Sequence, residues 1–389
     1  MTRPTSVLHA RVVTGAGGGP DKTIMRSAAY LPRERFDFAA AYLHPPGDPG
    51  TARLWDTAHE HGMDMVTLPD RGATDRRVLR QLIDLCRRRH VDIWHSHDYK
   101  TDVLGLFVRR HCPGIKLVST VHGFTRENLK TRFYARLNDF ALRHFDHVFA
   151  VSPELLQHCA RRGVSPEKLS YLPNAIELDG YAMRCHAGYQ STRQTLGLAD
   201  GDSAIAVLGR LSKEKGVDRA VRLFAELRTQ GQRANLHLIG NGPERGRLES
   251  LADSLGVADR VVFHGWSAGP GAILRGMDLL LSTSHREGMP NALLEAMALG
   301  VPVAATAVGG VPEMLGQGAC GELLAPNSTS MWPRQVAALL SPGPKQSVHV
   351  LNARQRVETH YAFAARMKRV RIQYELLAQS VPSVHRLAV

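Results

Sequence analysis

The chain has 389 residues, about two and a half times a typical domain of ~150 residues, which predicts two domains. Its 43% hydrophobic and 22% charged residues exclude a disordered protein. Lys and Arg exceed Asp and Glu by 49 to 36, giving a net charge of +13 that is spread over both halves of the sequence. This spread excludes a basic tail and favours an anionic partner.

The five cysteines are scattered, and none forms a C-x-x-C pair. This pattern argues against a disulfide framework or a structural zinc site, and it favours a reducing compartment. The first residues lack the apolar stretch of a signal peptide, and no apolar run approaches the ~18 residues that span a bilayer. We therefore expect a cytoplasmic protein, which can still contact the inner face of the cell membrane.

Short apolar runs rich in β-branched residues alternate with amphipathic stretches along the chain. Continuous apolar strands that alternate with helices are typical of parallel sheets covered on both faces. The sequence thus predicts an α/β fold with two doubly wound, Rossmann-like domains facing each other across a cleft. The first series of predicted strands is Ser6–Val13, Phe38–Leu43, Met63–Leu68, Asp92–His95, Lys116–His122 and Val148–Val151. The second series is Ser203–Leu208, Asn235–Ile239, Arg260–His264, Met277–Ser282, Val301–Ala305 and Gly321–Leu324.

The domain boundary is predicted in the aperiodic segment that begins near Leu172. We place an acceptor-side domain at residues 1–175 and a nucleotide-sugar-binding domain at residues 176–389. A last helix, at about residues 353–379, could pack back on the first domain. Ligands of such sheets lie beyond the carboxyl ends of the strands, so motifs at those ends are the candidates for chemistry.

A glycine-rich loop, Gly17-Gly18-Gly19, follows the first strand and precedes a predicted helix. Glycines allow close approach of a ligand, and a helix N-terminus favours a phosphate or a sugar hydroxyl. Pro20 occupies the third glycine position of G-x-G-x-x-G, so the dinucleotide fingerprint is incomplete. A flexible turn without a ligand explains the same residues equally well.

Two cations flank the loop after the first strand of the second domain. Arg210 follows Gly209, and Lys215 precedes Gly216. Arginine binds phosphate oxygens in a bidentate manner and lysine adds a point charge, so the pair suits a diphosphate leaving group. An ordinary charged turn remains the alternative.

Two carboxylates, Glu287 and Glu295, are separated by seven residues. Pro290 suits the first turn of a helix that runs to about Leu299, so both carboxylates can face one site. Glu295 could accept hydrogen bonds from ribose hydroxyls, and Glu287 from a transferred sugar. The alternative is two solvated acids, which the apolar neighbours of Glu295 disfavour.

Histidines end two strands of the first domain: His95 and His97 at one, His122 at the other. The first two could bind a metal, but no third ligand is evident from spacing, so we interpret them as polar walls of a cleft. Asp200 and Asp202 resemble a metal-binding D-x-D pair. They precede a strand, at the wrong end of the sheet, and we reject them.

Taken together, these motifs resemble the retaining glycosyltransferases of family four, which have the two-domain GT-B fold. The resemblance covers nearly the whole chain in the expected order. It rests on Gly17–Gly19, His122, Pro173-Asn174, Gly209-Arg210, Lys215-Gly216, Gly240-Asn-Gly-Pro-Glu244, Phe263-His-Gly265, the Glu287…Glu295 pair, Pro302 and Gly309-Gly310.

The resemblance implies a role for each matching residue. Arg210 and Lys215 would neutralise the leaving diphosphate, Glu295 would hold the ribose, Glu287 the donor sugar, and His122 would line the cleft near the anomeric carbon. The two cations would replace a metal, so no metal and no cofactor is expected. The remaining predicted donor-binding residues are Gly17, Gly18, Gly19, Gly209, Gly242, His264, Gly288, Met289, Pro290 and Asn291. Met289 departs from the aromatic residue of many members, which leaves the shape beside the donor sugar undetermined.

We therefore expect a retaining enzyme that moves a sugar from a nucleoside-diphosphate donor to a glycan or a lipid-linked saccharide, in cell-surface or exopolysaccharide biosynthesis. One rival, a two-domain dehydrogenase, would need the fingerprint that the glycine loop lacks. The other is a non-catalytic protein of the same fold that binds a sugar nucleotide. A nucleic-acid partner is not expected, because no pattern of aromatic and basic residues supports one.

The stretch from Leu129 to Phe145 is a basic amphipathic helix pattern, with Phe133, Leu137 and Phe140 at helical spacing. Such a helix can rest on anionic lipid. It can also bury its apolar stripe within its own domain, and we favour this second interpretation.

Overall fold

The computed structural model describes residues 3–15, 17–72, 75–123, 129–341 and 343–380, with side chains from residue 133 onward in the helix that begins at Leu129. The chain divides into two compact units. The first unit comprises residues 1–173 and 364–389, and the second comprises residues 174–363. The chain therefore crosses between the units twice.

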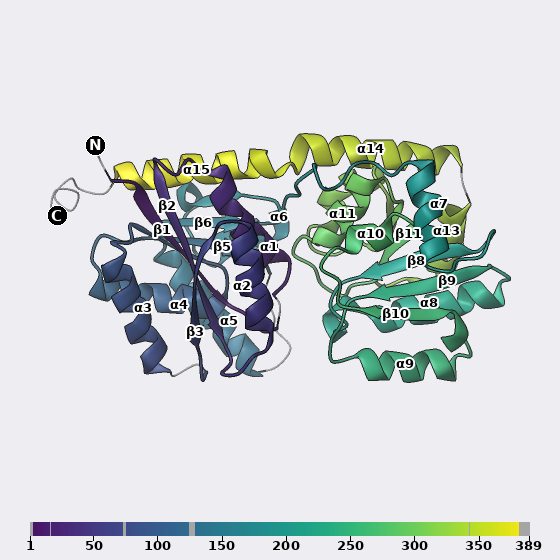
Figure 1. The fold of residues 1–389 in the computed structure, drawn as a ribbon, viewed down its shortest axis with the longest axis horizontal. Coiled ribbons are helices and arrows are strands. Elements are labelled where there is room, and N and C mark those ends of the chain that lie inside the picture. The colour runs from purple at the N-terminus through teal and green to yellow at the C-terminus, as the bar shows by residue number, and fades with distance from the viewer. Residues whose placement is uncertain (1–2, 16, 73–74, 124–128, 342, 381–389) are drawn as a thin grey trace. The chain divides into compact units, whose positions relative to one another are not determined.

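The described residues of the first unit form a seven-stranded parallel sheet in the order β3-β2-β1-β4-β5-β6-β7 (Figure 1). The strands are β1 (Thr5–Val12), β2 (Phe36–His44), β3 (Asp64–Pro69), β4 (Ile93–Ser96), β5 (Lys116–Val121), β6 (His147–Ala150) and β7 (Leu169–Tyr171). The helices are α1 (Gly19–Ser27), α2 (Gly50–Glu60), α3 (Arg76–Arg88), α4 (Tyr99–His111), α5 (Leu129–Arg143), α6 (Pro153–Arg161) and α15 (Phe363–Gln379).

The second unit contains a six-stranded parallel sheet in the order β10-β9-β8-β11-β12-β13. Its strands are β8 (Ser203–Leu208), β9 (Ala234–Ile239), β10 (Val261–Gly265), β11 (Leu279–Ser282), β12 (Val303–Thr306) and β13 (Glu322–Leu324). Its helices are α7 (His186–Thr195), α8 (Val217–Thr229), α9 (Arg245–Ser254), α10 (Pro270–Leu274), α11 (Asn291–Leu299), α12 (Val311–Met314), α13 (Trp332–Leu340) and α14 (Pro344–His360).

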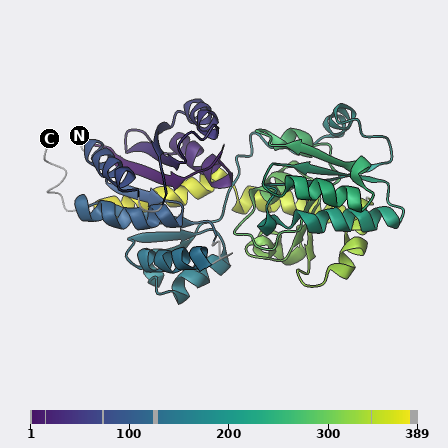
Figure 2. The ribbon, with the colours of Figure 1, turned by 90° about the horizontal axis from the view of Figure 1, so that it is seen from below.

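Strand order reverses between β1 and β4 in the first sheet and between β8 and β11 in the second. Because crossovers between parallel strands are right-handed, a reversal places the connecting helices on both faces of the sheet. Helices lie on either side of each sheet in Figure 2. The reversal also opens a crevice at the carboxyl ends of the two strands concerned. A ligand site is therefore expected after Val12 and Ser96 in the first unit, and after Leu208 and Ser282 in the second.

The α/β fold with two doubly wound parallel sheets is confirmed, and so are all twelve predicted strands, whose ends differ by at most two residues. Strand β7 was missed because it has only three residues, all half-buried, so it presents no apolar run. The single last helix is wrong. The chain forms two helices, α14 and α15, that are separated at Tyr361 and Ala362.

The break between α14 and α15 has a tertiary cause. Ala362 forms a parallel β-bridge with Ile176. The Ile176 N–H donates to the carbonyl of Tyr361 at 2.9 Å, and the Phe363 N–H donates to the carbonyl of Ile176 at 3.0 Å. These bonds take backbone groups from the helical ladder. No proline or glycine marks the position, so the sequence pattern could not reveal it.

Helix α15 packs on the first unit, where the Tyr374 ring lies against Phe36 and Phe38 of β2. The buried Arg366 donates to the carbonyl oxygens of Leu172 and Pro173. The Tyr374 hydroxyl, also buried, pairs with Nδ1 of His95. Helix α15 thus contacts β4 through His95.

Candidate active site

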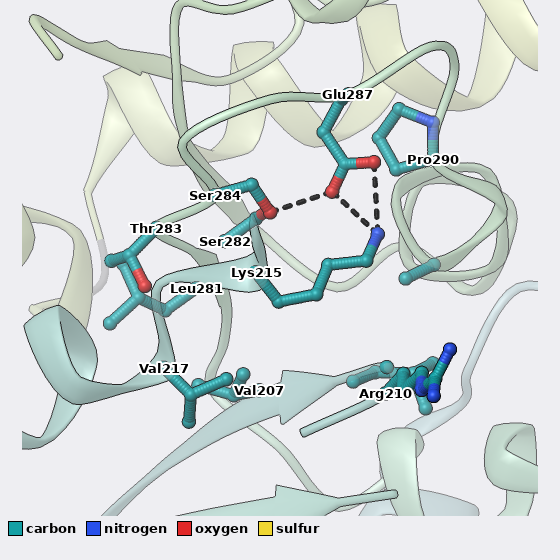
Figure 3. A pocket seen from close by; sticks show the side chains of 13 residues that line it. Val207, Arg210, Lys215, Val217, Leu281, Ser282, Thr283, Ser284, Glu287 and Pro290 are labelled. Atoms are coloured by element: carbon teal, nitrogen blue, oxygen red, sulfur yellow. Dashed lines mark hydrogen bonds and ion pairs between the residues drawn. The ribbon is translucent and has the colours of Figure 1, made fainter. Parts of the chain in front are cut away.

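The second unit has a pocket at the carboxyl ends of β8 and β11, where the strand order reverses (Figure 3). Backbone and side chains from three loops meet there. Its lining comprises Val207, Leu208, Gly209, Arg210, Lys215, Val217, Leu281, Ser282, Thr283, Ser284, Glu287, Pro290 and Ala292. The structure therefore brings together Arg210, Lys215 and Glu287, which lie up to 77 residues apart in the sequence.

An ion pair joins two of the predicted catalytic side chains. The ammonium of Lys215 lies 2.7 Å from Oε1 and 2.9 Å from Oε2 of Glu287 (Figure 3). The Ser284 hydroxyl also donates to Oε1 of Glu287 at 2.6 Å. The Glu287 side chain is 8% exposed and that of Lys215 is 29% exposed. The sequence assigned these residues to different parts of a ligand and did not predict their contact.

The loop that carries Lys215 is fixed by a glycine. Lys215 ends a short 3₁₀ turn, Lys213–Lys215, and Gly216 follows with φ of +56°. A Cβ at Gly216 would lie 2.4 Å from the carbonyl oxygen of Thr283, which no side chain could tolerate. The Thr283 hydroxyl in turn donates to the carbonyl of Gly216 at 2.8 Å. These contacts hold the ends of β8 and β11 together and aim Lys215 at Glu287.

A second close backbone contact fixes the Glu287 loop. A Cβ at Gly309, where φ is +57°, would lie 1.7 Å from the carbonyl oxygen of Glu287. The Gly310 N–H donates to the carbonyl of Gly288 at 2.8 Å. The buried Asn174 amide donates to the carbonyl of Met289 at 2.7 Å. The loop is therefore held from two sides, and its carboxylate keeps a defined position.

Arg210 is exposed and forms no ion pair with another described residue. Figure 3 shows its side chain apart from the Lys215–Glu287 pair, at another side of the pocket. Its five N–H donors can therefore meet an anion without breaking a protein contact. Lys215 has three ammonium hydrogens, and two hydrogen bonds to Glu287 leave one for a ligand.

Glu295 lies on α11, which begins at Asn291 directly after Pro290. The residue is 5% exposed, and Leu293, Leu294, Ala296 and Met297 around it are completely buried. Solvation on a helix surface, the alternative interpretation of Glu295, is therefore wrong. The Glu287 side chain is 8% exposed and paired with Lys215, so the same alternative fails for it.

Two further predicted donor-binding residues lie at neighbouring strand ends. A Cβ at Gly242 would lie 2.3 Å from the Leu211 carbonyl oxygen, so this glycine is required for loop packing whether or not a ligand is present. His264 stacks on His237, with Nε2 of His264 2.9 Å from Nδ1 of His237. Burial lowers the pKa of His237 to about 4 and also lowers the pKa of His264. Both rings are therefore neutral at pH 7.

The glycine loop of the first unit has a partner within the protein. The Gly18 N–H donates to Oδ2 of Asp21 at 2.6 Å, and Oδ1 of Asp21 pairs with Arg11 at 2.5 Å. The Gly15 N–H donates to Asp48 at 2.8 Å. Because Asp21 occupies the first N–H of this helix end, the loop offers less to a phosphate than the sequence implied. A phosphate would compete with the Asp21 carboxylate for the Gly18 N–H. A sugar hydroxyl would not, because it can itself donate a hydrogen bond to that carboxylate.

The structure adds a histidine that sequence spacing did not reveal. His9, on β1, stacks on both His95 and His97, with ring centroids 4.8 and 5.1 Å apart. The three residues each offer a nitrogen within 4.8 Å of the others. Both nitrogens of His95 lie in hydrogen bonds, to Tyr374 and Thr120, and those of His97 contact His9 and His122. Each of these nitrogens therefore has a hydrogen-bonding contact within the protein. A nitrogen whose lone pair accepts such a hydrogen bond cannot bind a metal with the same lone pair.

The D-x-D pair lies at the amino end of β8, away from the pocket. Asp202 is buried and accepts hydrogen bonds from Arg260 at 2.7 Å and from Arg233 at 3.1 Å. Arg260 and the other hydrogen-bonding partners lower the pKa of this carboxyl despite the opposing effect of burial. Asp202 therefore fastens the base of the sheet.

Comparison with known proteins agrees with this architecture. The family described as "Glycosyl transferase 4-like domain" matches residues 18–175, and "Glycosyl transferases group 1" matches residues 189–356. A crystal structure of Anabaena Alr3699/HepE in complex with UDP-glucose superposes with a TM-score of 0.82 at 18% identity, over 95% of this chain and 99% of that one. At that identity the likeness shows the fold, which is GT-B. The two units and the matched families define the chain as a glycosyltransferase.

The chain is also similar in sequence to characterised glycosyltransferases. The chain is 29% identical to N-acetyl-alpha-D-glucosaminyl L-malate synthase of Bacillus anthracis, over 68% of this chain and 70% of that protein. It is 26% identical to the UDP-Gal:alpha-D-GlcNAc-diphosphoundecaprenol alpha-1,3-galactosyltransferase of Escherichia coli, over 75% of this chain and 77% of that protein. Across four such relatives it spans 49–77% of their lengths. The chain belongs to family four of the glycosyltransferases, with the GT-B fold.

Proposed function

We propose that the chain is a retaining glycosyltransferase that takes a sugar from a nucleoside-diphosphate donor and needs no metal ion. The observation that carries this proposal is the pocket at β8 and β11, which is lined by both the exposed Arg210 and the Lys215–Glu287 pair. The UDP-glucose complex of the structural relative supports a nucleotide sugar as the donor.

In this proposal the donor is bound mainly by the second unit. Arg210 and the remaining ammonium hydrogen of Lys215 contact the diphosphate, and their positive charge stabilises the phosphate as the glycosidic bond breaks. Glu295 accepts hydrogen bonds from the ribose, and Glu287 accepts them from the donor sugar. Gly209, Gly242, His264 and the segment Gly288–Asn291 complete the donor contacts. The two cations supply the charge that a divalent metal would otherwise provide.

Retention places the attacking acceptor hydroxyl on the same face of the sugar as the leaving phosphate. A phosphate oxygen of the donor can then receive the proton of that hydroxyl, so no side chain has to act as a base. We assign the acceptor to the first unit, where His122 and the Gly17–Gly19 loop lie at strand ends. The undecaprenol-linked substrate of the Escherichia coli relative supports a lipid-linked saccharide as acceptor, in cell-surface or exopolysaccharide biosynthesis.

The test begins with a screen of nucleotide sugars for thermal stabilisation of the purified chain. The stabilising donor is then incubated with saccharide and lipid-linked acceptors, and NMR of the product determines the anomeric configuration. We expect the same anomeric configuration in product and donor, without added metal. An inverted product would exclude the retaining mechanism.

A non-catalytic protein that binds a sugar nucleotide is the alternative function. It predicts stabilisation by a nucleotide sugar with neither transfer nor donor hydrolysis for any acceptor. The chain retains Arg210, Lys215, Glu287 and Glu295, and this favours the enzyme over a protein whose active site has decayed.

We also propose that the first unit contacts an anionic membrane surface through α5. Phe133, Leu137 and Phe140 are 64%, 37% and 53% exposed, so burial of this stripe, the interpretation favoured from the sequence, is wrong for these three residues. Arg136 and Arg143 on the same helix are also exposed. Apolar side chains beside cations match the chemistry of an anionic lipid interface. No helix among the described residues is long and apolar enough to cross a membrane.

Vesicle sedimentation tests this contact. Binding to vesicles that contain phosphatidylglycerol should fall with added salt and with the double variant Phe133→Ser and Phe140→Ser. The matched control is Val348→Ser with Leu351→Ser, which removes two equally exposed apolar side chains from α14 of the second unit. Equal binding by both double variants would contradict the assignment to α5.

A further inference from the structure

A buried serine in the pocket of the second unit contacts the carboxylate of Glu287. Ser284 lies two residues after the end of β11 and is 2% exposed. Its hydroxyl donates to Oε1 of Glu287 at 2.6 Å (Figure 3). The carboxylate is ionised in its pair with the ammonium of Lys215, so it has no hydrogen to give. The hydroxyl is therefore the donor, and its one hydrogen lies in this bond.

The sheet fixes the position of Ser284. Its carbonyl accepts a hydrogen bond at 2.7 Å from the hydroxyl of Thr306, which is 1% exposed on β12. Strand β12 pairs with β11 up to Ser282, two residues before Ser284. The Ser282 hydroxyl lies 3.5 Å from that of Ser284 and must be the donor there, because the hydrogen of Ser284 is already used. Ser284 is thus held by the neighbouring strand rather than by the charged side chains of the pocket.

The two oxygen atoms of Glu287 have different surroundings. Oε1 accepts from both Ser284 at 2.6 Å and Lys215 at 2.7 Å, whereas Oε2 accepts from Lys215 at 2.9 Å. Each oxygen of an ionised carboxylate accepts about two hydrogen bonds. Within the described part of the chain, these contacts fill Oε1 and leave one acceptor position on Oε2. A ligand hydroxyl therefore finds its acceptor at Oε2.

Ser284 is the contact that fixes the plane of this carboxylate. The ammonium of a lysine is a compact point charge whose three donors rotate on a flexible stem, so Lys215 follows the carboxylate in many orientations. The last torsion of a glutamate side chain is broad, so Glu287 does not select one orientation by itself. A hydroxyl fixed by β12 determines where one oxygen lies, and the planar geometry of the group then determines the place of the other.

The importance of the serine contact grows when an anion enters the pocket. Lys215 is 29% exposed, and a phosphate group attracts its ammonium away from the carboxylate. The hydroxyl of Ser284 carries no net charge, and its hydrogen already lies in the bond to Glu287, so the phosphate does not compete for it. Ser284 is then the contact that keeps Glu287 in place while Lys215 is shared between two anions.

We propose that Ser284 is a positioning residue that holds one oxygen of Glu287 and thereby directs the other to a hydroxyl group of the donor sugar. The proposal rests on the proposed function for the identity of the ligand, a nucleotide sugar. Ser284 does not contact the ligand and acts through Glu287 alone. It therefore affects the binding of the sugar, whereas the nucleoside diphosphate binds without its help.

Isothermal calorimetry with a pair of ligands tests this difference. The pair is UDP-glucose, the compound bound in the structural relative, and UDP; another nucleotide sugar selected by the thermal screen, with its free nucleoside diphosphate, replaces them. Ser284→Ala should weaken binding of the nucleotide sugar about tenfold, the value of one hydrogen bond, and change binding of the free diphosphate less than about twofold. Ser284→Thr keeps the hydroxyl and should keep the wild-type affinities. Equal losses for both ligands in Ser284→Ala would overturn the proposal.

The matched control is Ser212→Ala. Ser212 is 6% exposed, and its hydroxyl donates to Oε1 of Glu214 at 2.6 Å, the same length as the bond of Ser284. Both residues lie in the loop after β8, and neither is among the described residues that line the pocket. The backbone bond from the Lys215 N–H to the Ser212 carbonyl, at 3.0 Å, remains in the variant. Both affinities should be unchanged, and effects equal to those of Ser284→Ala would reduce Ser284 to a role in loop packing and overturn the proposal.

A double-mutant cycle shows whether Ser284 acts through Glu287. In the background of Glu287→Ala the serine has no carboxylate to hold. The double variant should therefore bind the nucleotide sugar as weakly as Glu287→Ala does, and no more weakly. A further tenfold loss would mean that Ser284 contacts the ligand itself, which would overturn its assignment as a positioning residue.

Crystal structures without any ligand keep this test separate from the proposed function. We expect one orientation of the Glu287 carboxylate in the wild type and a rotated carboxylate, or two orientations, in Ser284→Ala. The same single orientation in both structures would overturn the proposal even if the chain transfers a sugar. Failure of the wild type to bind any nucleotide sugar would instead contradict the proposed function, and the two crystal structures would still decide whether Ser284 positions Glu287.

Discussion

At the end of β8 the second unit presents an exposed arginine, Arg210, and a lysine that is 29% exposed. At the end of β4 the first unit presents His97, which is 6% exposed and neutral. Both positions lie where the strand order reverses, so the topology is the same and the electrostatics are opposite. Accessible cations suit a phosphate, whose charge grows as a bond breaks, whereas neutral N–H donors suit hydroxyl groups. The fold therefore provides equivalent positions, and the side chains determine which ligand chemistry each position accepts.

The largest expected effect is the loss of a cation in the second unit. Lys215→Ala should lower turnover about 10²–10³-fold, the range for removal of one preorganised donor at a developing charge. The control Lys213→Ala removes an exposed lysine from the same loop and should leave turnover unchanged. Steady-state kinetics with the identified nucleotide sugar decide the outcome. If Lys215→Ala and Arg210→Ala both kept near-wild-type turnover, the two cations would not be the residues that stabilise the diphosphate.

The buried, neutral histidine His9 of the first unit predicts that the folded chain loses stability in acid. Burial lowers the pKa of His9 from its ordinary value of 6.5, which applies to the unfolded chain, to about 3 in the folded chain. Between these values the unfolded state binds more protons, so folded stability falls as the pH falls. From pH 6.5 to 4.5, His9 accounts for about 2–3 kcal/mol of this loss at 1.36 kcal/mol per unit.

His9→Leu should therefore lose less stability on acidification than the wild type does. Hydrogen exchange of β1 and β4 peptides, corrected for intrinsic rates, measures the difference. The exposed His59 on α2 supplies the control, and His59→Leu should keep the wild-type dependence on pH. Identical pH dependence in the wild type and His9→Leu would show that His9 is not a neutral buried group.

A smaller effect should separate the two carboxylates of the second unit. Glu295→Ala should weaken binding of free UDP about tenfold or more, because one hydrogen bond to a charged group is lost. Glu287→Gln should change UDP affinity less and transfer more, because its partner is the sugar. Isothermal calorimetry with UDP, paired with transfer assays, makes the comparison. Equal loss of affinity in both variants would contradict separate roles.

The smallest expected effect is that of metal removal. Turnover in EDTA should match turnover in magnesium, because Arg210 and Lys215 supply the positive charge at the diphosphate. Assays after exhaustive chelation test this directly. Complete loss that magnesium restores would instead require a search for ligands around His95, His97 and Asp98.

Much of the chain was predictable from local patterns. Apolar runs of four to eight residues identified twelve strands, because strands buried on both faces must be continuously apolar. Pro290 marked the start of α11, and the glycines after β1 and β8 marked the strand ends. The half-buried strand β7 and the break at Tyr361 were not predictable, because neither leaves a local signal.

The sequence by itself determined the alternation of strands and helices, the cations at residues 210 and 215 and the two glutamates, since each depends on residue type and spacing. Only the tertiary structure decided the contacts between these parts. It joined Lys215 to Glu287, and it showed that Phe133 and Phe140 lie on the surface. It also placed His9 beside His97, 88 residues away. The reason is physical. Long-range packing sets the order of strands in a parallel sheet, so the residues next to a side chain in the sequence do not indicate which residue it contacts on another strand.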